Sequence, residues 1–489
     1  MDQAVALTEP DDPPRIRHVI DLATPLSDLP LREPFFLPAD LTIAQAAAAM
    51  RRSRVSSALI RGAEPRQLGI VTSTDLRDRV LAESSTPDDL DAGSPVASAV
   101  TWNVRSAPST APVSVALLMM LDEGFRHVPV TRDGEVIGLV SSSDILRHQA
   151  HPPMLLLARI HSLSSLDAVR DYPTEVAAAA RSMMDDGLAA IRISRIVAGL
   201  NDALTIRLIE LAQADLGPAP CEFAWLSLGS AGRLEQNLLT DQDNALVYAD
   251  CASDEEEDQA RVYFGALAAR VNDGLTRAGF PPCPGGFMAT NWCLPLTSWV
   301  RELRNLIRAP APDALVEAAV FLDFRVAHGT LDVTSMDDVL LSANGTPRFM
   351  VALSSTAGSF PPPLRSFGRV RTDGGYLDLK RYGLYALVIL ARIYAMECAS
   401  PARATIDRLN DAAAHHVVGE STARELADVY EYLLQLRLRA QLHRIEAGDE
   451  PDNRICYDEL TGLEQSRLRD CLRRLSTIQK ATAARLSSP

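Results

Sequence analysis

One pattern occurs twice in the first third of the chain, and it restricts the fold more than any other feature. Residues 35–82 and 96–148 each read as an apolar helix, a short apolar strand, a turn, and a second strand ending in a polar cluster before another helix. The closing strings, Gly69–Leu76 and Gly138–Ile145, lie 69 positions apart. A helix-strand-strand-helix unit of this size cannot bury both faces of its sheet alone. We therefore expect the two units to pack against each other.

Length and charge restrict the remaining possibilities. A chain of 489 residues should hold about three domains. The net charge of -15 argues against a protein that coats nucleic acid or anionic membrane, since both require basic patches. Seven scattered cysteines without a CxxC pair are typical of free thiols in a reducing compartment. The acidic, proline-containing residues 1–14 do not form a signal peptide. We expect a soluble, cytoplasmic protein with no nucleic-acid or membrane partner.

The paired strings, of the form G-h-h-[ST]-x-x-[ST]-D, resemble a pair of CBS domains. The resemblance implies an α/β fold, association as a homodimer, and an adenine nucleotide as ligand. It places the ribose and phosphate of that nucleotide on Thr72, Asp75, Ser141 and Asp144. Independently, a carboxylate can accept hydrogen bonds from both ribose hydroxyls, and a helix N-terminus offers free N–H groups to phosphate. In the alternative interpretation, the neighbouring hydroxyl residues only cap the following helices: Ser73, Thr74, Ser142 and Ser143.

The most informative part of the second half runs from Phe223 to Tyr248. Residues 223–228 read as a strand, Gly229–Gly232 as a tight turn whose small residues let the backbone approach a phosphate, and residues 244–248 as a second strand, with a short helix after the turn. Asp241 and Asp243 are two apart, so on an extended segment both carboxylates point to one face. Two converging carboxylates beside a phosphate-binding turn predict a Mg²⁺ site.

A Gly-Ser turn followed 11 residues after the serine by Asp-x-Asp resembles the DNA polymerase beta-like nucleotidyltransferases. The resemblance implies attack by an acceptor hydroxyl on the α-phosphorus of a nucleoside triphosphate, with pyrophosphate leaving. Asp241 and Asp243 would be the catalytic metal ligands. The triphosphate would be held by Gly229, Ser230, Gly232 and Arg233.

The longer string Leu228-Gly-Ser-x-Gly-Arg-x-Glu-Gln-x-Leu-x-Thr-Asp-Gln-Asp-Asn resembles the DUF294 family of nucleotidyltransferase-like domains. That family is often fused to CBS pairs and is related to the uridylyltransferase that modifies the PII protein. Further matching strings are Cys283–Asn291, Phe321–Arg325, Leu377–Lys380 and Gly448–Asn453. From Leu384 onward, apolar residues recur near the 3.6 period and predict an antiparallel helical bundle. By resemblance, this bundle receives the acceptor.

Two departures from the family pattern concern activity. Active relatives carry a third carboxylate on a neighbouring strand, which we expect near residues 286–291, yet no Asp or Glu occurs between Asp273 and Glu302. Asp323 is the nearest substitute, with pairing to Arg325 as its alternative role. The chain also contains no His-Asp dipeptide, so it lacks the hydrolase motif of the PII uridylyltransferase. Lys380 can reach a phosphate or pair with Asp378.

The predicted architecture is α/β plus all-α. It comprises an N-terminal extension (1–34), a tandem CBS pair (35–150), a nucleotidyltransferase-like α/β domain with N-terminal helices (155–305), and a helical putative substrate-binding domain (306–485). The predicted function is transfer of a nucleoside monophosphate to a protein or small-molecule hydroxyl in signal transduction. The alternative is an inactive nucleotide sensor that acts through a partner.

Overall fold

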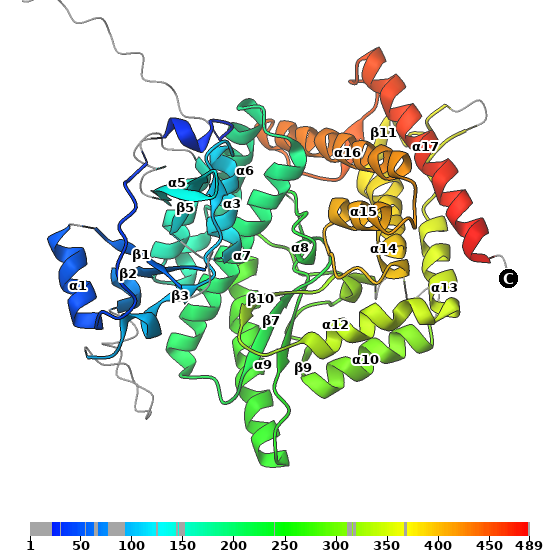
Figure 1. Ribbon diagram of the computed structural model, residues 1–489. Helices are drawn as coiled ribbons and strands as arrows, with labels where there is room; N and C mark the ends of the chain where they lie inside the picture. The colour runs from blue at the N-terminus through cyan, green and yellow to red at the C-terminus, as the bar shows by residue number, and fades with distance from the viewer. Residues whose placement is uncertain are drawn as a thin grey trace, which may run out of the picture. The chain divides into compact units, whose positions relative to one another are not determined.

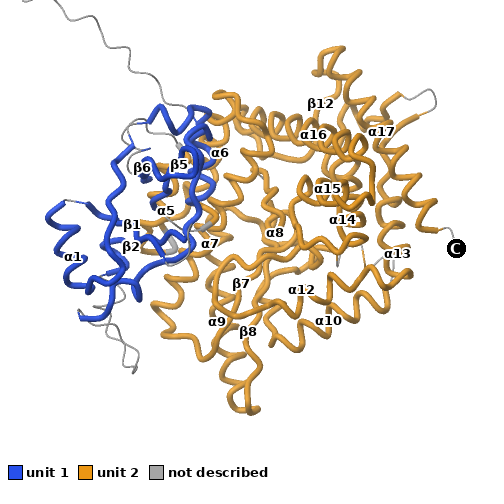
Figure 2. Tube along the Cα trace, viewed as in Figure 1, with its two compact units in different colours: residues 1–120, 125–151 blue, residues 121–124, 152–489 orange. Residues whose placement is uncertain are grey.

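The chain divides into two compact units in a computed structural model, residues 1–120 with 125–151, and residues 121–124 with 152–489 (Figure 2). The structure describes residues 22–29, 31–53, 55–62, 67–76, 93–123, 126–142, 145, 152–238, 240–310, 315, 319–365 and 369–487. Among these residues, no helix has both the length and the hydrophobicity needed to cross a bilayer.

The first unit contains the sequence repeat as two small sheets. In the first copy, α1 (Ile43–Arg52) leads to the antiparallel strands β1 (Ser57–Arg61) and β2 (Leu68–Thr72), with β3 (Thr101–Trp102) beside β2. In the second copy, α3 (Val113–Glu123) leads to the antiparallel strands β5 (His127–Arg132) and β6 (Glu135–Ser141). A short strand, β4 (Ala107–Pro108), pairs parallel with β5. The predicted helix-strand-strand order is confirmed in both copies.

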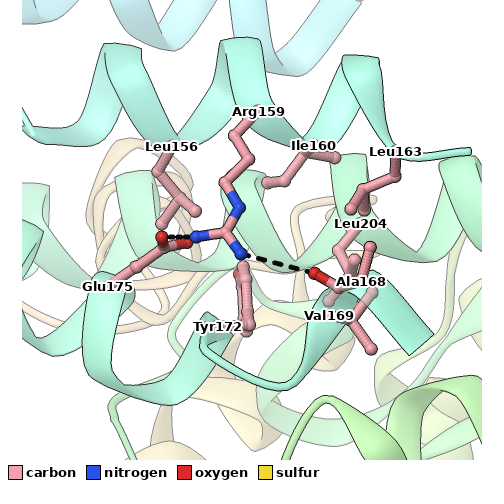
Figure 3. Close-up of a pocket in the computed structure, with 9 residues that line it drawn as sticks. All are labelled: Leu156, Arg159, Ile160, Leu163, Ala168, Val169, Tyr172, Glu175 and Leu204. Carbon is pink, nitrogen blue, oxygen red and sulfur yellow. Dashed lines mark hydrogen bonds and ion pairs between the residues drawn. The ribbon is translucent and has the colours of Figure 1, made fainter. Parts of the chain in front are cut away.

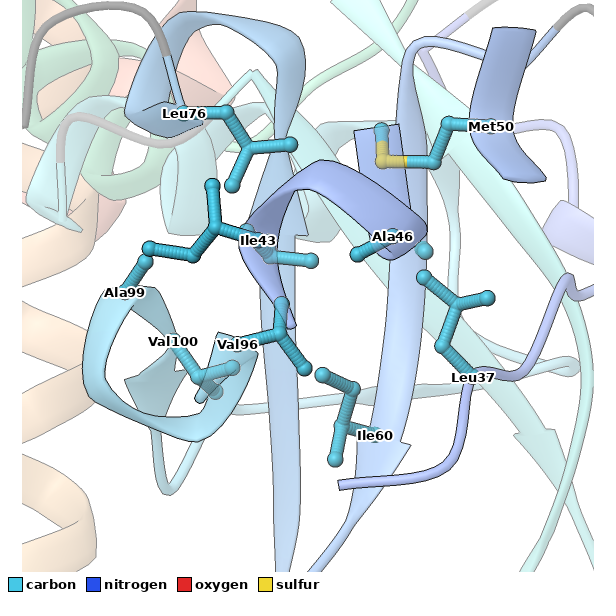
Figure 4. Close-up of a cluster of buried hydrophobic side chains, with 11 residues drawn as sticks. Leu37, Ile43, Ala46, Met50, Ile60, Leu76, Val96, Ala99 and Val100 are labelled. Carbon is cyan, nitrogen blue, oxygen red and sulfur yellow. The ribbon is translucent and has the colours of Figure 1, made fainter. Parts of the chain in front are cut away.

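Apolar side chains join the helix to its sheet in the first copy (Figure 4). Ile43, Ala46 and Met50 lie on one side of α1. They pack against residues of β1 and β2, such as Ile60, and of the short helical turn that begins at Val96. The helix begins with a capping box, because Thr42 accepts the backbone N–H of Gln45 and the Gln45 side chain accepts that of Thr42. Its 3.6-residue apolar spacing therefore predicts the buried face correctly.

The two copies share a second apolar cluster, as the pattern predicts. Leu59 and Ile70 of the first copy pack with Leu139 of the second, and Arg61 of β1 pairs with Glu135 of β6 at 3.3 Å. Each copy thereby buries a sheet face that it cannot cover alone.

A four-stranded sheet forms the centre of the second unit, in the order β10-β7-β8-β9 (Figure 1). The strands are β7 (Phe223–Ser227), β8 (Asn244–Tyr248), β9 (Cys293–Pro295) and β10 (Arg325–Gly329). Only the β8–β9 pair is parallel. All residues of β7 and β8 are buried, which fits their continuous apolar sequences.

Helices surround this sheet. The predicted helical segment 174–216 is two helices, α6 (Tyr172–Asp185) and α7 (Ala190–Leu216), preceded by α5 (Pro152–Ser162). After β8 come α9 (Asp254–Arg277) and α10 (Leu296–Arg308). Two local predictions are wrong. The turn is itself the one-turn helix α8, and the described residues between it and β8 form no further helix. The expected strand near residues 286–291 lies instead at β9.

The last third is helical, as predicted, and a two-stranded ribbon joins its parts. The helices are α12 (Thr334–Leu341), α13 (Pro347–Gly358), α14 (Tyr385–Glu397), α15 (Thr405–Ala414), α16 (Glu420–Glu446) and α17 (Gly462–Ser487). The ribbon pairs β11 (Tyr376–Asp378) with β12 (Arg454–Cys456). Short helical turns complete the described chain: η1 (Leu26–Asp28), η2 (Val96–Ala99), η3 (Leu166–Val169), η4 (Ala319–Asp323), η5 (Ser342–Gly345) and the π-helical η7 (Lys380–Leu384).

Candidate functional site

The Gly-Ser turn and the Asp-x-Asp segment meet at one end of the sheet. The backbone N–H of Leu228 donates to the carbonyl of Asp243 at 3.0 Å. A Cβ on Gly229 would lie 3.2 Å from Asp243 Oδ2 and 2.9 Å from Val320 Cγ2, and its φ is +55°. Glycine at 229 therefore satisfies both a left-handed conformation and a close approach. The structure brings the two predicted motifs into direct contact.

At Gly232, the absence of a side chain is required by contact with another backbone segment, whereas the sequence pattern indicated only the approach of a phosphate. A Cβ at this position would lie 1.7 Å from the backbone oxygen of Asp323, so α8 packs directly on η4. The absence of a side chain at Gly232 thus lets two backbone segments approach each other.

In the Asp-Gln-Asp-Asn segment, the two amide side chains, Gln242 and Asn244, make hydrogen bonds to the surrounding protein. The amides of Gln242 and Asn244 both accept hydrogen bonds from Asn272 Nδ2 of α9, at 2.8 Å and 3.0 Å. Gln242 Nε2 also donates to the carbonyl of Phe280, and Asn244 Oδ1 accepts the backbone N–H of Ala289. Because these amides are buried and paired, they fix the backbone that carries the two aspartates.

Asp241 and Asp243 both line a small cavity at the end of the sheet. Burial raises the pKa of Asp243 to about 6, and Asp241 adds to the rise, whereas Cys283, Lys380 and Arg233 oppose it. Two oxygen-donor groups that repel each other across a cavity fit a divalent Mg²⁺ ion, which prefers carboxylate ligands and takes further oxygens from phosphates and water. Within the described part of the chain, no cluster of three or more His, Cys, Asp and Glu side chains could hold a metal by itself.

A larger cavity of about 200 Å³ adjoins the Gly-Ser turn. Gly229, Ser230, Arg233 and Asp243 line one side of it. The other side comes from the helical last third, through η7, α14 and α16, and contributes Lys380, Arg392, Tyr430 and Arg437. Four predicted site residues therefore face one space, together with cations from helices that lie more than 130 positions away in the sequence.

Arg233 lies at this cavity but is already bound to carboxylates. Its Nε donates to Glu235 at 2.7 Å and its Nη1 donates to Asp323 at 2.5 Å. Glu235 is itself buried and also accepts a hydrogen bond from Thr405 Oγ1 at 2.9 Å. Two of the five N–H groups of Arg233 are therefore used by carboxylates, which leaves fewer donors for a phosphate.

Asp323 is fully buried among three guanidinium groups, those of Arg233, Arg392 and Arg408. Burial by itself raises the pKa of Asp323, but the three arginines more than offset this and hold its pKa well below the usual value. The expected pairing of Asp323 with Arg325 is wrong, since Arg325 pairs with Asp202 at 2.6 Å. A carboxylate held in this way does not accept a proton at neutral pH.

Lys380 faces the aspartate pair. Loss of surrounding water lowers the pKa of Lys380, with Arg437 adding to the effect and Asp241 and Asp243 opposing it. The carboxylate of Asp378 accepts the backbone N–H of Arg381 at 2.8 Å. Lys380 lines the cavity that Asp243 also lines, and a phosphate contact by Lys380 stays a prediction.

The CBS positions are arranged differently. Asp75 Oδ2 accepts the backbone N–H of Thr72 at 2.8 Å and Thr72 Oγ1 at 2.7 Å, while Thr72 Oγ1 accepts the backbone N–H of Asp75 at 3.1 Å. The capping residue is therefore Thr72, and not Ser73 or Thr74. Ser141 is buried at the end of β6. Asp144 lies outside the described residues.

A third cavity, between α5, α6 and α7, has no comparable chemistry (Figure 3). Its volume is only about 10 Å³ and its lining is mostly apolar. Arg159 pairs there with Glu175, which leaves no free charge pointing into the space (Figure 3).

Comparison with known sequences assigns most of the chain to three families. Residues 174–313 match the family described as "Putative nucleotidyltransferase DUF294", and residues 347–486 match the "Putative nucleotidyltransferase substrate binding domain". Residues 26–82 and 96–151 match the CBS domain.

Curated relatives match about a quarter of the chain. An uncharacterized 17.7 kDa protein of Acidianus ambivalens is 30% identical over 127 residues, which are 26% of this chain and 73% of that protein. A CBS domain-containing protein of Arabidopsis thaliana is 32% identical over 118 residues, 24% of this chain but only 20% of that protein.

Solved structures cover a similar share of the chain. A CBS-domain protein from Agrobacterium tumefaciens is 27% identical, with 26% of this chain and 94% of that chain covered and a TM-score of 0.23. A CBS domain protein from Pyrobaculum aerophilum complexed with AMP is 29% identical, with 25% and 89% covered and a TM-score of 0.22. The chain therefore combines two CBS domains with a domain of the family described as "Putative nucleotidyltransferase DUF294" and the substrate binding domain that carries the same description.

Proposed function

We propose that this protein is a CBS-regulated, Mg²⁺-dependent nucleotidyltransferase that transfers a nucleoside monophosphate from a triphosphate to a hydroxyl of a protein or small molecule. One observation carries the proposal. Asp243 and the Gly229-Ser230 turn share a cavity with Lys380 and Arg437, so one carboxylate of the Asp-x-Asp pair and two cations suited to phosphate line one space. The proposed reaction is of the type performed by the PII uridylyltransferase, in the cytoplasm.

Asp241 and Asp243 would hold Mg²⁺ in this proposal. When bound, the ion would supply positive charge that neutralises phosphate and favours ionisation of the acceptor hydroxyl. Gln242 and Asn244 keep the two carboxylates in place through Asn272, so the site needs little reorganisation on binding. Ser230, at the start of the one-turn helix, is placed to contact the triphosphate.

A nucleotide-sensing function without catalysis is the second candidate, and Asp323 favours it. The carboxylate next to β10 is bound by three arginines and offers no general base, while β9 contains no acidic residue. In this case the domain binds nucleotide and Mg²⁺ and passes the information to a partner protein.

The CBS pair is the proposed sensor in both cases, as a homodimer that binds an adenine nucleotide. Thr72 and Asp75 lie at the strand end where the ribose is expected, and Ser141 lies at the equivalent position of the second copy. Binding must exchange the internal Thr72–Asp75 hydrogen bonds for bonds to the ribose.

A transfer assay separates the two functions. Purified protein is incubated with Mg²⁺, each α-labelled nucleoside triphosphate, and extract of the source cells as acceptor. The variant Asp241→Ala, Asp243→Ala is compared with the control Asp215→Ala, whose side chain is 76% exposed. Label transfer by wild type and control, but not by the double variant, supports the enzyme. Mg²⁺-dependent nucleotide binding without transfer supports the sensor. If neither transfer nor binding is observed, the CBS pair is the one candidate ligand site that remains.

A further inference from the structure

A small cavity lies where η4 meets α12, α14 and α15, and it is distinct from the space beside the Gly-Ser turn. Its volume is about 20 Å³, which is enough for one particle about the size of a water molecule. The described lining is mostly apolar and includes three charged side chains, those of Arg392, Arg403 and Arg408. Among the described residues, neither the Gly-Ser turn nor the aspartate pair contributes to it. The cavity therefore suits a small ion and not a phosphate chain.

Two of these arginines have a buried N–H group without an acceptor in the described part of the chain. Arg392 is 3% exposed; its Nε and Nη2 bind Asp323, but its Nη1 has no partner. Arg408 is also 3% exposed; its Nε donates to the carbonyl of Ala402 at 2.9 Å and its Nη2 pairs with Asp323 at 2.7 Å, but its Nη1 has no partner. Arg392 lines the larger cavity as well, whereas Arg408 lines only the small one among the described cavities. Buried donors are almost always satisfied, so two of them at one cavity point to an acceptor inside it.

The other polar groups of the lining are already paired. Arg403 donates to two backbone carbonyls and pairs with Asp337. Ser400 donates its hydroxyl to the half-buried Asp411 and accepts the backbone N–H of Ala402 at 3.1 Å. A water molecule between the two free Nη1 groups would itself need acceptors for its two hydrogens. An ion that only accepts hydrogen bonds has no such requirement, so the donor-rich lining favours an anion.

The balance of charge points the same way. Asp323 binds all three arginines of a buried cluster, Arg233, Arg392 and Arg408, and Glu235 binds the first of them. Three cations and two carboxylates leave one positive charge over. Burial lowers the pKa of Arg408 to about 10, helped by Arg392 and Arg233, although its carboxylate partner opposes the change. An uncompensated buried charge is costly, so the cluster is stabilised by one further negative charge.

We propose that this cavity is a binding site for one small monovalent anion, chloride, held by the Nη1 groups of Arg392 and Arg408. The ion neutralises the arginine cluster and holds η4, which precedes the edge strand β10, against α14 and α15 of the helical last third. The site goes beyond the proposed function, because it requires neither Mg²⁺ nor nucleotide.

Thermal unfolding of the full chain tests the site. Sodium gluconate is replaced by sodium chloride at constant ionic strength, in EDTA and without nucleotide; gluconate is too large for a cavity of about 20 Å³. A ligand that binds only the folded state stabilises it in proportion to the logarithm of its concentration. We expect the unfolding midpoint to rise by about 2–5 °C for a rise in chloride of about a hundredfold. An unchanged midpoint would overturn the proposal.

A pair of arginine variants locates the effect. Arg408→Met removes one of the two free donors and the surplus charge, and the control Arg424→Met removes an arginine of α16 whose side chain is 76% exposed. Arg408→Met also loses a bond to Asp323, so the quantity compared is the shift caused by chloride and not the midpoint itself. We expect the shift to be lost in Arg408→Met and retained in Arg424→Met. Equal shifts in the two variants would place the ion elsewhere and overturn the proposal.

Diffraction from wild-type crystals grown in sodium bromide locates the ion without any substitution. Anomalous scattering distinguishes bromide from water. We expect a bromide ion in contact with the Nη1 atoms of both Arg392 and Arg408. A water molecule at that position, or bromide bound only elsewhere on the protein, would overturn the proposal even if Arg408→Met does not fold.

Discussion

Two aspartates in the second unit, one half-buried and one fully buried, have opposite electrostatic surroundings. Asp243 lines a small cavity together with Asp241, and burial raises the pKa of Asp243 to about 6. Asp323 binds three arginines, which overcome the effect of burial and hold its pKa well below the usual value. The surroundings of Asp243 supply too little positive charge to offset its burial, whereas the three arginines around Asp323 supply more than enough.

The difference teaches how ions of opposite charge can complete the two regions. A cation placed between Asp241 and Asp243 relieves their repulsion, and an anion near Arg392 satisfies its unpaired Nη1. In our proposal, aspartate is a metal ligand in the first region, whereas Asp323 in the second region is a counter-ion to three arginines.

The largest expected effect comes from removing the counter-ion. Asp323→Ala leaves the guanidinium groups of Arg233, Arg392 and Arg408 with no common carboxylate, and we expect the free energy of unfolding to fall by about 3–5 kcal/mol. Urea denaturation measures the change. The control, Asp373→Ala, removes an aspartate whose side chain is 98% exposed and should change stability by no more than about 0.5 kcal/mol. Equal stability of the two variants would show that the arginine cluster does not need Asp323.

The contribution of Asp243 to the free energy of unfolding should change with pH in the opposite direction from that of an ordinary ion-paired carboxylate. The pKa of Asp243 rises on folding from 3.8 to about 6, so the folded state binds more protons between these values. Stability contributed by this group is present below pH 3.8 and is lost as the pH rises to about 6. In EDTA, the stability difference between wild type and Asp243→Asn should change by about 2–3 kcal/mol across this window.

Magnesium provides the corresponding check. Above pH 6, added Mg²⁺ should stabilise the wild type and leave Asp243→Asn unaffected. A pH-independent stability difference, or equal stabilisation of both proteins by Mg²⁺, would argue against a desolvated, metal-binding carboxylate at this position.

A substitution at Gly232 tests the contact between the Gly-Ser turn and the backbone of Asp323. A Cβ there would lie 1.7 Å from the backbone oxygen of Asp323, so Gly232→Ala must displace α8 from η4. We expect a loss of about 1–3 kcal/mol in the free energy of unfolding. The matched control, Gly265→Ala, is on α9 with nothing within 4 Å of the added atom, and should stabilise the protein by up to about 1 kcal/mol. If both substitutions stabilise, the close approach at Gly232 is not a constraint.

Local sequence patterns predict one side of the site and miss the other. The small residues at 229–232 and the alternation of Asp241 and Asp243 specify the turn and the strand entry, because both depend on neighbours in the sequence. Arg392 and Arg437 give no such signal, since an arginine in a helical segment usually lies on a solvated face. Their contact with the cavity depends on how α14 and α16 pack, which no short pattern encodes.

The role of Asp323 could not be read from the sequence for the same reason. Its neighbour Arg325 is only two positions away and suggests a local pair, yet its actual partners lie up to 90 positions away on either side. Lys380 had one usable signal, since it is one of only two lysines and lies in a matching family string. Fold class, by contrast, could be predicted from the repeat, from the apolar periodicity of the last third, and from the resemblance of the strings around Gly229 and Asp241 to a known family.

The smallest expected effect concerns the CBS turn, whose polar groups already satisfy each other. Thr72→Ala removes a cap and its bonds to Asp75, and should lower the stability of the first unit by about 1 kcal/mol, whereas the neighbouring control Ser73→Ala should cost less than about 0.5 kcal/mol. Thermal unfolding with and without an adenine nucleotide measures both effects. A ligand here replaces bonds that exist already, so its net stabilisation should be smaller than that of Mg²⁺ and nucleotide at the under-neutralised aspartates. Stronger stabilisation at the CBS turn would reverse this ranking and make it the main nucleotide site of the chain.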